Sequence, residues 1–276
     1  MELYPKAARS STPIFAFLTS RIKSSILVSP RTGGTETGNA KGKQKKGGFL
    51  PGIFGTVAFL VVGLCLCALF LLIYPGGELC RLFEYALVLM CFAFACGHRS
   101  DDPDGILAML ALLCTAGADF FLVALKEEQW LPGMAVYCFA QFFWALRLLL
   151  LESGRRRIGH SLVWAFTCGT LLVVAILLAR GADTLLLLSA VYASFLLTTV
   201  LFSWLTPRNL LFTLGMTLFL GCDLFVAVNN AALYVDLDAY PLFKTLYDIP
   251  FNMMWAFYGP SQMLLALSSA GSRRER

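Results

Sequence analysis

Charged residues are scarce in this chain: Asp, Glu, Lys and Arg make up only 14% of its 276 residues, whereas 58% are hydrophobic. A soluble domain of this length could not bury so much apolar surface, so the composition excludes an ordinary soluble protein and predicts an all-α membrane protein. Histidine is almost absent, and His98 and His160 alone cannot build a His-based triad or a di-iron centre. The nine cysteines form no CxxC pair and lie mostly in apolar runs, so we expect neither a metal site nor a disulfide framework.

Residues 1–48 differ in composition from the rest of the chain. They contain nine Lys and Arg residues against two Glu, and they become rich in Gly, Thr and Lys after Pro30. Such a segment cannot bury enough apolar area to offset its chain entropy, so we expect a disordered, basic, cytosolic arm. Residues 14–27 fit a weak amphipathic helix on an anionic membrane surface. A cleaved targeting peptide is the alternative interpretation of the arm.

Eight apolar runs follow the arm, each about long enough to cross a bilayer. We predict these spans at 53–74, 82–96, 106–125, 134–151, 162–179, 185–205, 210–228 and 251–267. Residues 49–269 should therefore form an eight-helix transmembrane domain, and 270–276 a basic cytosolic tail. Lys and Arg are concentrated in the arm, in the tail and in the loops after the second, fourth and sixth runs, which places both termini in the cytosol. An endomembrane and a bacterial inner membrane both fit this pattern.

One short motif occurs twice in these runs. The third run contains GADFFL at 117–122, and the seventh contains GCDLFV at 221–226, so Asp119 and Asp223 each lie inside an apolar segment. A carboxylate at such depth is costly in a bilayer, which makes it a candidate functional residue by default. The alternative is a hydrogen-bonding group that only holds helices together.

Each of these runs precedes a run in which a Tyr and a Gln are four residues apart. The pairs are Tyr137 with Gln141 and Tyr258 with Gln262. Residues four apart share one face of a helix, and in a bilayer a polar face must point into the bundle. The pattern suggests a parallel duplication that relates the third and fourth spans to the seventh and eighth. Arg147, near the cytosolic end of the fourth span, is expected to extend its charge to the membrane surface.

Asp119 and Asp223 are the candidate catalytic pair. Two neighbouring carboxyl groups in a low-dielectric cavity tend to share one proton, which places an acid beside a base. Such a pair can protonate an acid-labile bond and orient the water that attacks the resulting cation, and a site inside the membrane implies a lipid substrate. Asn229 and Asn230 follow Asp223 and could hydrogen-bond its ionised form, so Asp223 is favoured as the base. Proton relay in a transporter is the alternative from another functional class.

The chain resembles the YhhN-type lysoplasmalogenase family over about residues 49–269. The resemblance is most specific in DLFVAVN at 223–229 and in WAFYGPSQMLLALS at 255–268. Members of this family hydrolyse the vinyl ether of lysoplasmalogens to a fatty aldehyde and a glycerophospho-ethanolamine or -choline, and two intramembrane aspartates are proposed as their catalytic pair. Asp119 and Asp223 match those two positions.

The resemblance implies an ether hydrolase of lipid metabolism with a lysophospholipid substrate. It implies no cofactor, because vinyl ethers are acid-labile, and no nucleic-acid partner. We expect the substrate-binding residues to be Tyr137, Gln141, Asn229, Asn230, Tyr258 and Gln262.

Two positions depart from the family pattern. The family usually has an Ala-His pair followed by Tyr after the first Asp, whereas this chain has Ala140-Gln141, with Trp144 in place of the Tyr. Gln can hydrogen-bond a substrate oxygen but cannot titrate near neutrality. A Lys-Pro element near the start of the second span is replaced by CRLF at 80–83. A lipid transporter and an inactive relative that only binds lipid are therefore alternatives.

Overall fold

The computed structural model describes residues 53–73, 78–98, 102–125, 129–151, 156–205, 209–231 and 236–270. The expectations for the arm at 1–48 and for residues 271–276 of the tail fall outside these ranges. Every element described below belongs to one compact unit, Phe49–Arg276.

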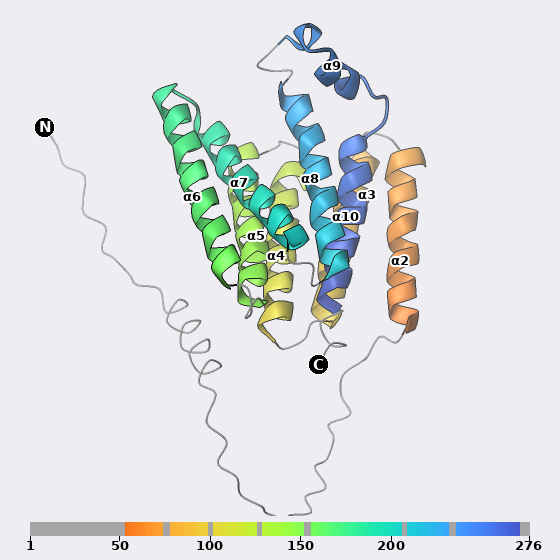
Figure 1. Ribbon diagram of the computed structural model, residues 1–276. Coiled ribbons are helices and arrows are strands. Elements are labelled where there is room, and N and C mark those ends of the chain that lie inside the picture. Colours follow the sequence, from red (N-terminus) through yellow and green to blue (C-terminus); the bar gives the residue numbers. More distant parts are fainter. Residues whose placement is uncertain are drawn as a thin grey trace, which may run out of the picture. The chain divides into compact units, whose positions relative to one another are not determined.

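The described residues form nine α-helices and three short turns, and no strand occurs among them. Two of the turns are π-helical and continue an α-helix, whereas the third is a 3-10 turn between α8 and α9 (Figure 1). In chain order the elements are α2 (Ile53–Ala68), η1 (Leu69–Ile73), α3 (Glu78–His98), α4 (Pro103–Asp119), η2 (Phe120–Ala124), α5 (Trp130–Leu151), α6 (Arg156–Ala179), α7 (Thr184–Leu205), α8 (Leu210–Ala231), η3 (Leu237–Ala239), α9 (Pro241–Tyr247) and α10 (Met253–Ala270).

Six helical segments are long and apolar enough to cross a membrane. They are Phe54–Leu72, Glu78–His98, Pro103–Ala124, Trp130–Leu149, Thr184–Leu205 and Leu210–Asn230. Six of the eight predicted spans thus meet this test among the described residues; α10 does not, and α6 contributes the shorter apolar stretch Gly169–Ala179.

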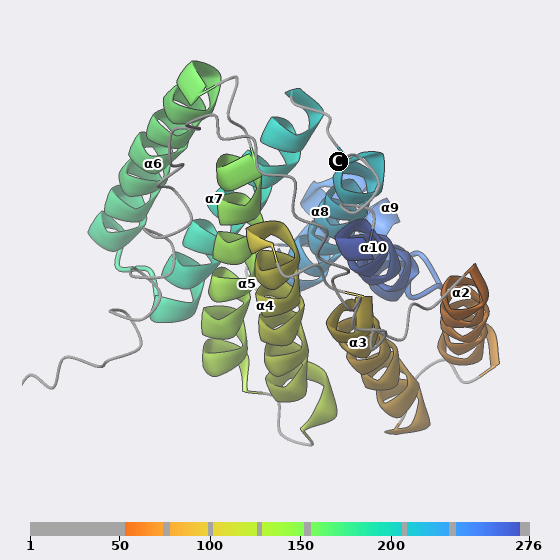
Figure 2. The same ribbon diagram turned by 90° about the horizontal axis from the view of Figure 1, so that it is seen from below.

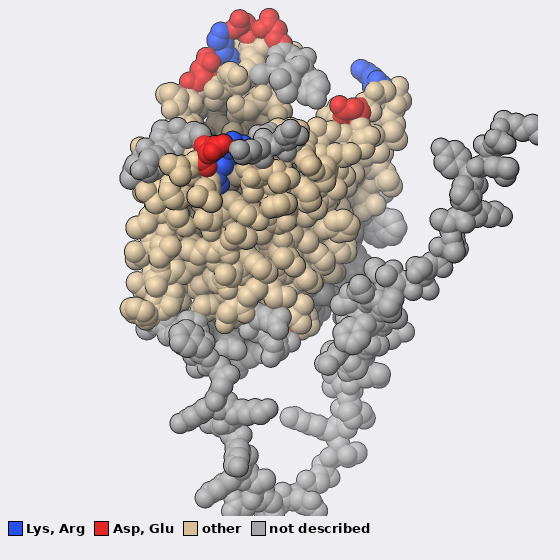
Figure 3. All heavy atoms as spheres, turned by 180° about the vertical axis from the view of Figure 1, so that it is seen from behind, with Lys and Arg blue, Asp and Glu red and all other residues tan. Residues whose placement is uncertain are grey.

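The surface of the described residues has the character expected of a multi-pass membrane protein. The large apolar side chains of Phe54, Leu171 and Leu210 are each more than half exposed. Figure 3 shows one face on which charged atoms gather toward one end, while the rest of the described surface there is uncharged. A surface of this kind is stable where lipid tails, not water, surround it.

Helices α4 and α5 begin three and four residues earlier than predicted, and each has a proline in its first turn. Pro103 is the first residue of α4, and the side chain of Asp102 caps this helix by accepting the Gly105 N–H at 3.0 Å. Pro132 lies in the first turn of α5, where the backbone N–H group that proline lacks would have no hydrogen-bond partner within the helix.

A helix that the sequence analysis did not predict follows α8. The stretch after the seventh span was expected to be a loop, but it contains η3 and the seven-residue α9, which starts at Pro241. Figure 1 shows α9 beyond the ends of α8 and α10. Leu242 and Phe243 of α9 are exposed, so this helix adds nothing to the core.

The pairs α4 with α5 and α8 with α10 have the most extensive contacts in the bundle. Figure 2 shows α2 and α6 at opposite edges, with the other long helices between them. Glycines bring α8 and α10 together: a Cβ at Gly215 would lie 3.0 Å from the Leu265 side chain, and one at Gly221 would lie 2.8 Å from Phe257. Small residues allow such close approach where lipid provides no hydrophobic driving force.

Helices α5 and α10 run in parallel, and the polar contacts between them join residues with a constant difference in residue number. The Tyr137 and Tyr258 hydroxyl oxygens are 2.6 Å apart, and Arg147 Nη1 donates to Ser268 Oγ at 2.8 Å. Both contacts join residues 121 positions apart. The side chains between these two contacts therefore face one another at matching levels.

Candidate active site

Asp119 is the last residue of α4, and two tyrosines hold its carboxyl group. The Tyr258 hydroxyl is hydrogen-bonded to Asp119 Oδ2 at 2.5 Å, and the Tyr137 hydroxyl is hydrogen-bonded to Oδ1. The Asp119 side chain is buried, and no Lys or Arg of the described chain forms an ion pair with it. The π-helical turn η2 begins at the next residue. Such turns are frequent at functional sites because they shift the register of a helix and re-aim a side chain.

Asp223 of α8 has a single tyrosine partner. Tyr192 of α7 donates its hydroxyl to Asp223 Oδ2 at 2.5 Å, and Asp223 itself is only partly buried. The Tyr192 ring packs edge-on against Tyr137, with ring centroids 5.8 Å apart. Asp119 and Asp223 lie close enough to interact electrostatically. The two aspartates thus belong to one cluster, which draws on α4, α5, α7, α8 and α10.

An aromatic wall fixes the orientation of the tyrosines in this cluster. The Phe219 ring packs edge-on against both Tyr258 and Tyr137, at centroid distances of 5.4 Å and 6.2 Å. Trp255 packs edge-on against the other side of Tyr258 at 5.0 Å. Edge-to-face packing of this kind favours one ring orientation. The hydroxyl groups are therefore held in place by packing as well as by hydrogen bonds.

The two glutamines lie one turn beyond the tyrosines, at one level. Gln141 and Gln262 are also 121 positions apart, so they share the register of the Tyr137–Tyr258 contact. Both side chains are fully buried, and neither the oxygen nor the nitrogen of either amide has a hydrogen-bond partner in the described chain. A buried polar group without a partner costs about 1–3 kcal/mol. These amides are the polar groups of the cluster with unused capacity for a ligand.

The two asparagines are placed differently from the other candidate binding residues. Asn229 and Asn230 are exposed near the end of α8, two turns beyond Asp223. The Asn229 side chain donates to the Phe225 carbonyl at 2.8 Å, and no contact of the described chain joins either asparagine to an aspartate. The structure therefore brings Tyr137, Gln141, Tyr258 and Gln262 to one part of the bundle and leaves the asparagines outside it.

Comparison with protein families places this cluster in a known context. The model of the YhhN family matches residues 79–269, which is more than half of the chain and includes both aspartates. The chain belongs to the YhhN family. Searches of curated proteins and of solved structures gave no match. The YhhN match confirms the resemblance inferred from residues 223–229 and 255–268.

The YhhN region also contains the buried carboxylate of Glu84, which the sequence analysis missed. Glu84 of α3 is buried, accepts a hydrogen bond from Cys80 Sγ at 3.3 Å and interacts electrostatically with Asp119. The criterion that selected Asp119, an ionisable residue inside an apolar run, would also have found Glu84. No group of three or more His, Cys, Asp or Glu residues in the described part of the chain is arranged to hold a metal ion.

Tyr192 was also missed, and its sequence context carries little signal. It is the only Tyr in the apolar run at 185–205, and no polar residue three or four positions away repeats the Tyr-Gln pattern of the other two helices. The contact with Asp223 depends on the packing of α7 against α8, which the sequence does not show.

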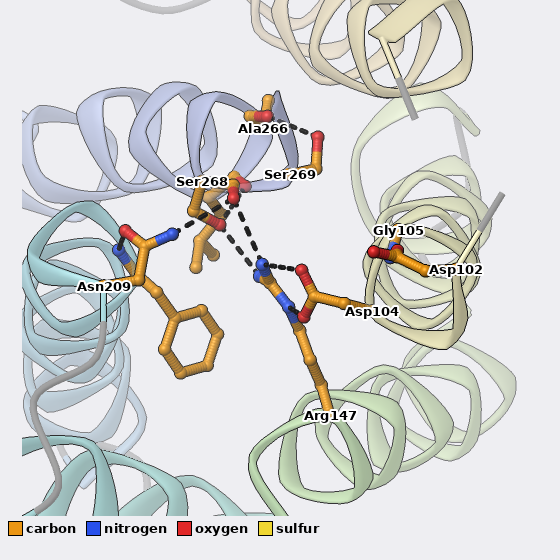
Figure 4. Close-up of polar contacts among 10 residues, drawn as sticks. Asp102, Asp104, Gly105, Arg147, Asn209, Ala266, Ser268 and Ser269 are labelled. Atoms are coloured by element: carbon orange, nitrogen blue, oxygen red, sulfur yellow. Dashed lines mark hydrogen bonds and ion pairs between the residues drawn. The ribbon is translucent and has the colours of Figure 1, made fainter. Parts of the chain in front are cut away.

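The prediction that Arg147 reaches the membrane surface was wrong. Its side chain is only 3% exposed and forms a two-pronged ion pair with Asp104 of α4, with Nε–Oδ1 at 2.5 Å and Nη2–Oδ2 at 3.0 Å (Figure 4). The guanidinium group also donates to the Ser268 hydroxyl and carbonyl oxygens. Because a carboxylate lies within reach inside the bundle, the charge is compensated there, and α4, α5 and α10 are tied together.

Proposed function

We propose that this YhhN protein is a lysoplasmalogenase-like hydrolase that cleaves the vinyl ether bond of a lysoplasmalogen inside the membrane. The observation that carries the proposal is the cluster of Asp119 and Asp223, two carboxyl groups from different helices that interact with each other and are held by phenols instead of cations. Membership of the YhhN family, which is associated with lysoplasmalogenase activity, supports the same reaction.

The chemistry requires one acid, one base and one water molecule. The protonated Asp gives its proton to the vinyl carbon distal to the ether oxygen, which leaves an oxocarbenium ion at the adjacent carbon. The ionised Asp takes a proton from the water that adds to this cation, and a hemiacetal forms. When the hemiacetal C–O bond breaks, the second Asp protonates the leaving glycerol oxygen, and the hemiacetal hydroxyl returns a proton to the first. The products are a fatty aldehyde and a glycerophospho-alcohol, and both carboxyl groups regain their starting states.

The binding residues divide by position along the helices. Tyr137 and Tyr258 contact the reacting carboxyl group directly, whereas Gln141 and Gln262 offer unpartnered amides one turn away. We propose that these amides hydrogen-bond the glycerol oxygens or the attacking water. Asn229 and Asn230, exposed at the end of α8, would meet the head group of the lipid as it enters.

We also propose that all eight long helices cross the membrane and that both termini are cytosolic. Helix α6 has 24 residues, enough to cross a bilayer of about 30 Å. Helix α10 packs extensively along α8, which itself has the length and apolarity of a span. Two features are those expected of a parallel duplication. Helices α5 and α10 share one register, and the contacts of α4 with α5 correspond to those of α8 with α10.

The test is aldehyde release from a lysoplasmalogen by the full-length protein purified in detergent. Wild type should release aldehyde, and Asp119→Asn and Asp223→Asn should each lower the rate by about 10²–10⁴-fold, the usual contribution of a general acid or base. Asp238→Asn is the matched control, because Asp238 is exposed and contacts only Lys244 and its own turn. No release by a folded wild type would refute the proposal, and pH-driven uptake into reconstituted vesicles would then favour a transporter.

A further inference from the structure

We propose that Asp119 is the proton donor of the pair and that Tyr137 and Tyr258 are positioning residues that hold its proton in a closed ring of three hydrogen bonds. This inference rests on the proposed function and assigns the acid role, which the reaction alone leaves open. It comes from counting protons among oxygen atoms that contact one another.

Three oxygen–oxygen contacts form the ring. Tyr258 Oη lies 2.5 Å from Asp119 Oδ2, Tyr137 Oη contacts Asp119 Oδ1, and the two hydroxyl oxygens lie 2.6 Å from each other. The two measured distances are at the short end of the range for O–H···O hydrogen bonds. Each contact therefore needs a proton between its two oxygens.

The number of protons depends on the state of Asp119. A phenol has one hydroxyl proton, and an ionised carboxylate has none, so an ionised Asp119 would leave two protons for three contacts. One pair of oxygens would then face each other with lone pairs only. A protonated Asp119 supplies the third proton, and the ring closes: the carboxyl group donates to one tyrosine, that tyrosine donates to the other, and the second tyrosine donates back to the carboxyl group.

Asp223 does not need an added proton. Its one phenol contact, with Tyr192, already has a proton, and an ionised carboxylate is a good acceptor for it. Repulsion between the two carboxylates disfavours two charges in the cluster, so one charge, on Asp223, is the arrangement that fits both sets of contacts.

The titratable groups around Asp119 add no positive charge that would favour its ionised form. These groups come from the helices packed around the cluster. Each of them is neutral when protonated and negatively charged when deprotonated. They are Glu84 and Tyr85 of α3, Tyr137 of α5, Tyr192 of α7, Cys222 and Asp223 of α8, and Tyr258 of α10.

The ring also accounts for the return of a proton to Asp119 after proton transfer. When the carboxyl O–H bond breaks and a C–H bond forms on the substrate, the tyrosine that donated to the other tyrosine can turn its proton to the new carboxylate, which then accepts charge-assisted hydrogen bonds from both phenols. The contact between the two tyrosines is left without a proton, so this ionised state favours taking a proton back. The proton that returns from the hemiacetal closes the ring again.

Infrared spectroscopy of the purified full-length protein tests the assignment without any substrate. A protonated carboxyl group has a C=O stretch that is separate from the carboxylate bands and shifts in D2O. At neutral pH this band should be present in wild type, lost in Asp119→Asn and retained in Asp223→Asn. Glu84→Gln identifies any contribution from the buried carboxyl group of Glu84, and Asp238→Asn is the matched exposed control.

Tyrosine variants test the ring itself. Tyr137→Phe and Tyr258→Phe each remove one proton and one acceptor, so the Asp119 band should shift in frequency in both variants while circular dichroism shows that they remain folded. An unchanged band in Asp119→Asn, its loss in Asp223→Asn, or the same frequency in both tyrosine variants as in wild type would overturn the inference. A wild type that has the band but releases no aldehyde would refute the hydrolase proposal and leave the ring in place.

Discussion

Helix α4 buries a carboxylate at each end, and the two are stabilised by opposite means. Asp104, in the first turn, is paired with the guanidinium group of Arg147, which Ser268 also binds. Asp119, in the last turn, has only the hydroxyl groups of Tyr137 and Tyr258. The exposures of the two side chains, 3% and 2%, are almost equal.

The comparison shows that burial does not by itself make an acid functional in a membrane. An aspartate that is neutralised by a bidentate arginine keeps its charge, has both oxygens bonded and has no proton to give. An aspartate surrounded by phenols has no cation to hold its charge and can exchange a proton with its surroundings. The chemistry of the partner therefore separates the structural end of α4 from the end that we propose to be reactive.

The largest effects should come from the same substitution at these two positions. Asp119→Asn should lower aldehyde release by about 10²–10⁴-fold and leave the free energy of unfolding nearly unchanged, because Asn keeps the shape and two polar atoms of Asp. Asp104→Asn should lower the free energy of unfolding by about 3–5 kcal/mol, because it leaves the Arg147 charge buried without its counter-ion. Aldehyde release per folded molecule and unfolding by SDS in mixed micelles measure the two effects. An Asp104→Asn protein as stable as wild type but inactive would reverse the assignment of the two ends.

Removing both charges at the structural end should cost less than removing one. Arg147→Met alone leaves the Asp104 carboxylate unpaired, whereas Arg147→Met with Asp104→Leu replaces the ion pair by apolar groups. We expect the double variant to be more stable than Arg147→Met by about 3–5 kcal/mol, because it no longer buries an unpaired charge. Unfolding of the four members of this double-mutant cycle in mixed micelles gives the coupling energy. Additive effects would mean that the contacts in Figure 4 do not act as one unit.

The sequence was sufficient to predict the elements that a bilayer dictates. Apolar runs of the length of a span, interrupted by charged or Pro-Gly segments, located all the long helices, and Asp119 and Asp223 stood out because carboxylates are rare in such runs. The spacing of Tyr137 and Gln141 correctly gave one helix face. The starts of α4 at Pro103 and of α5 at Trp130 were placed three and four residues too late, because a proline can follow the end of one helix or lie in the first turn of the next.

The sequence was insufficient for features that depend on which helices are neighbours. Arg147 could have reached the membrane surface from its position on α5, and only the packing of α4 beside it shows that Asp104 is closer. The link of Tyr192 to Asp223 depends in the same way on α7 lying against α8. Asn229 follows Asp223 closely in sequence, yet its side chain turns back to the carbonyl of Phe225 on its own helix.

A smaller effect on the free energy of unfolding should distinguish Tyr192, the partner of Asp223, from Tyr137, a partner of Asp119. A hydrogen bond to a charged group contributes about 1.5–3 kcal/mol, whereas a bond between neutral groups contributes about 0.5–1.5 kcal/mol. If Asp223 is ionised and Asp119 is protonated, Tyr192→Phe removes one hydrogen bond to a charged group, whereas Tyr137→Phe removes two between neutral groups, so the loss in the free energy of unfolding per hydrogen bond should be larger in Tyr192→Phe. Tyr240→Phe is the control, because Tyr240 is exposed and outside the cluster. A larger loss per hydrogen bond in Tyr137→Phe would place the charge on Asp119.

The smallest effect concerns the two glutamines between the reactive and the structural ends. Gln141 is fully buried and both of its amide atoms lack partners in the described chain, so Gln141→Leu removes an unsatisfied group and should raise the free energy of unfolding by about 1 kcal/mol. Asn229→Ala, at an exposed position, should change it by less than about 0.5 kcal/mol. If the amide binds substrate and does not react, KM should rise in Gln141→Leu while kcat changes little. A fall in kcat at unchanged KM would instead mean that Gln141 acts on the reacting atoms, and a loss of stability would mean that its amide has a structural partner.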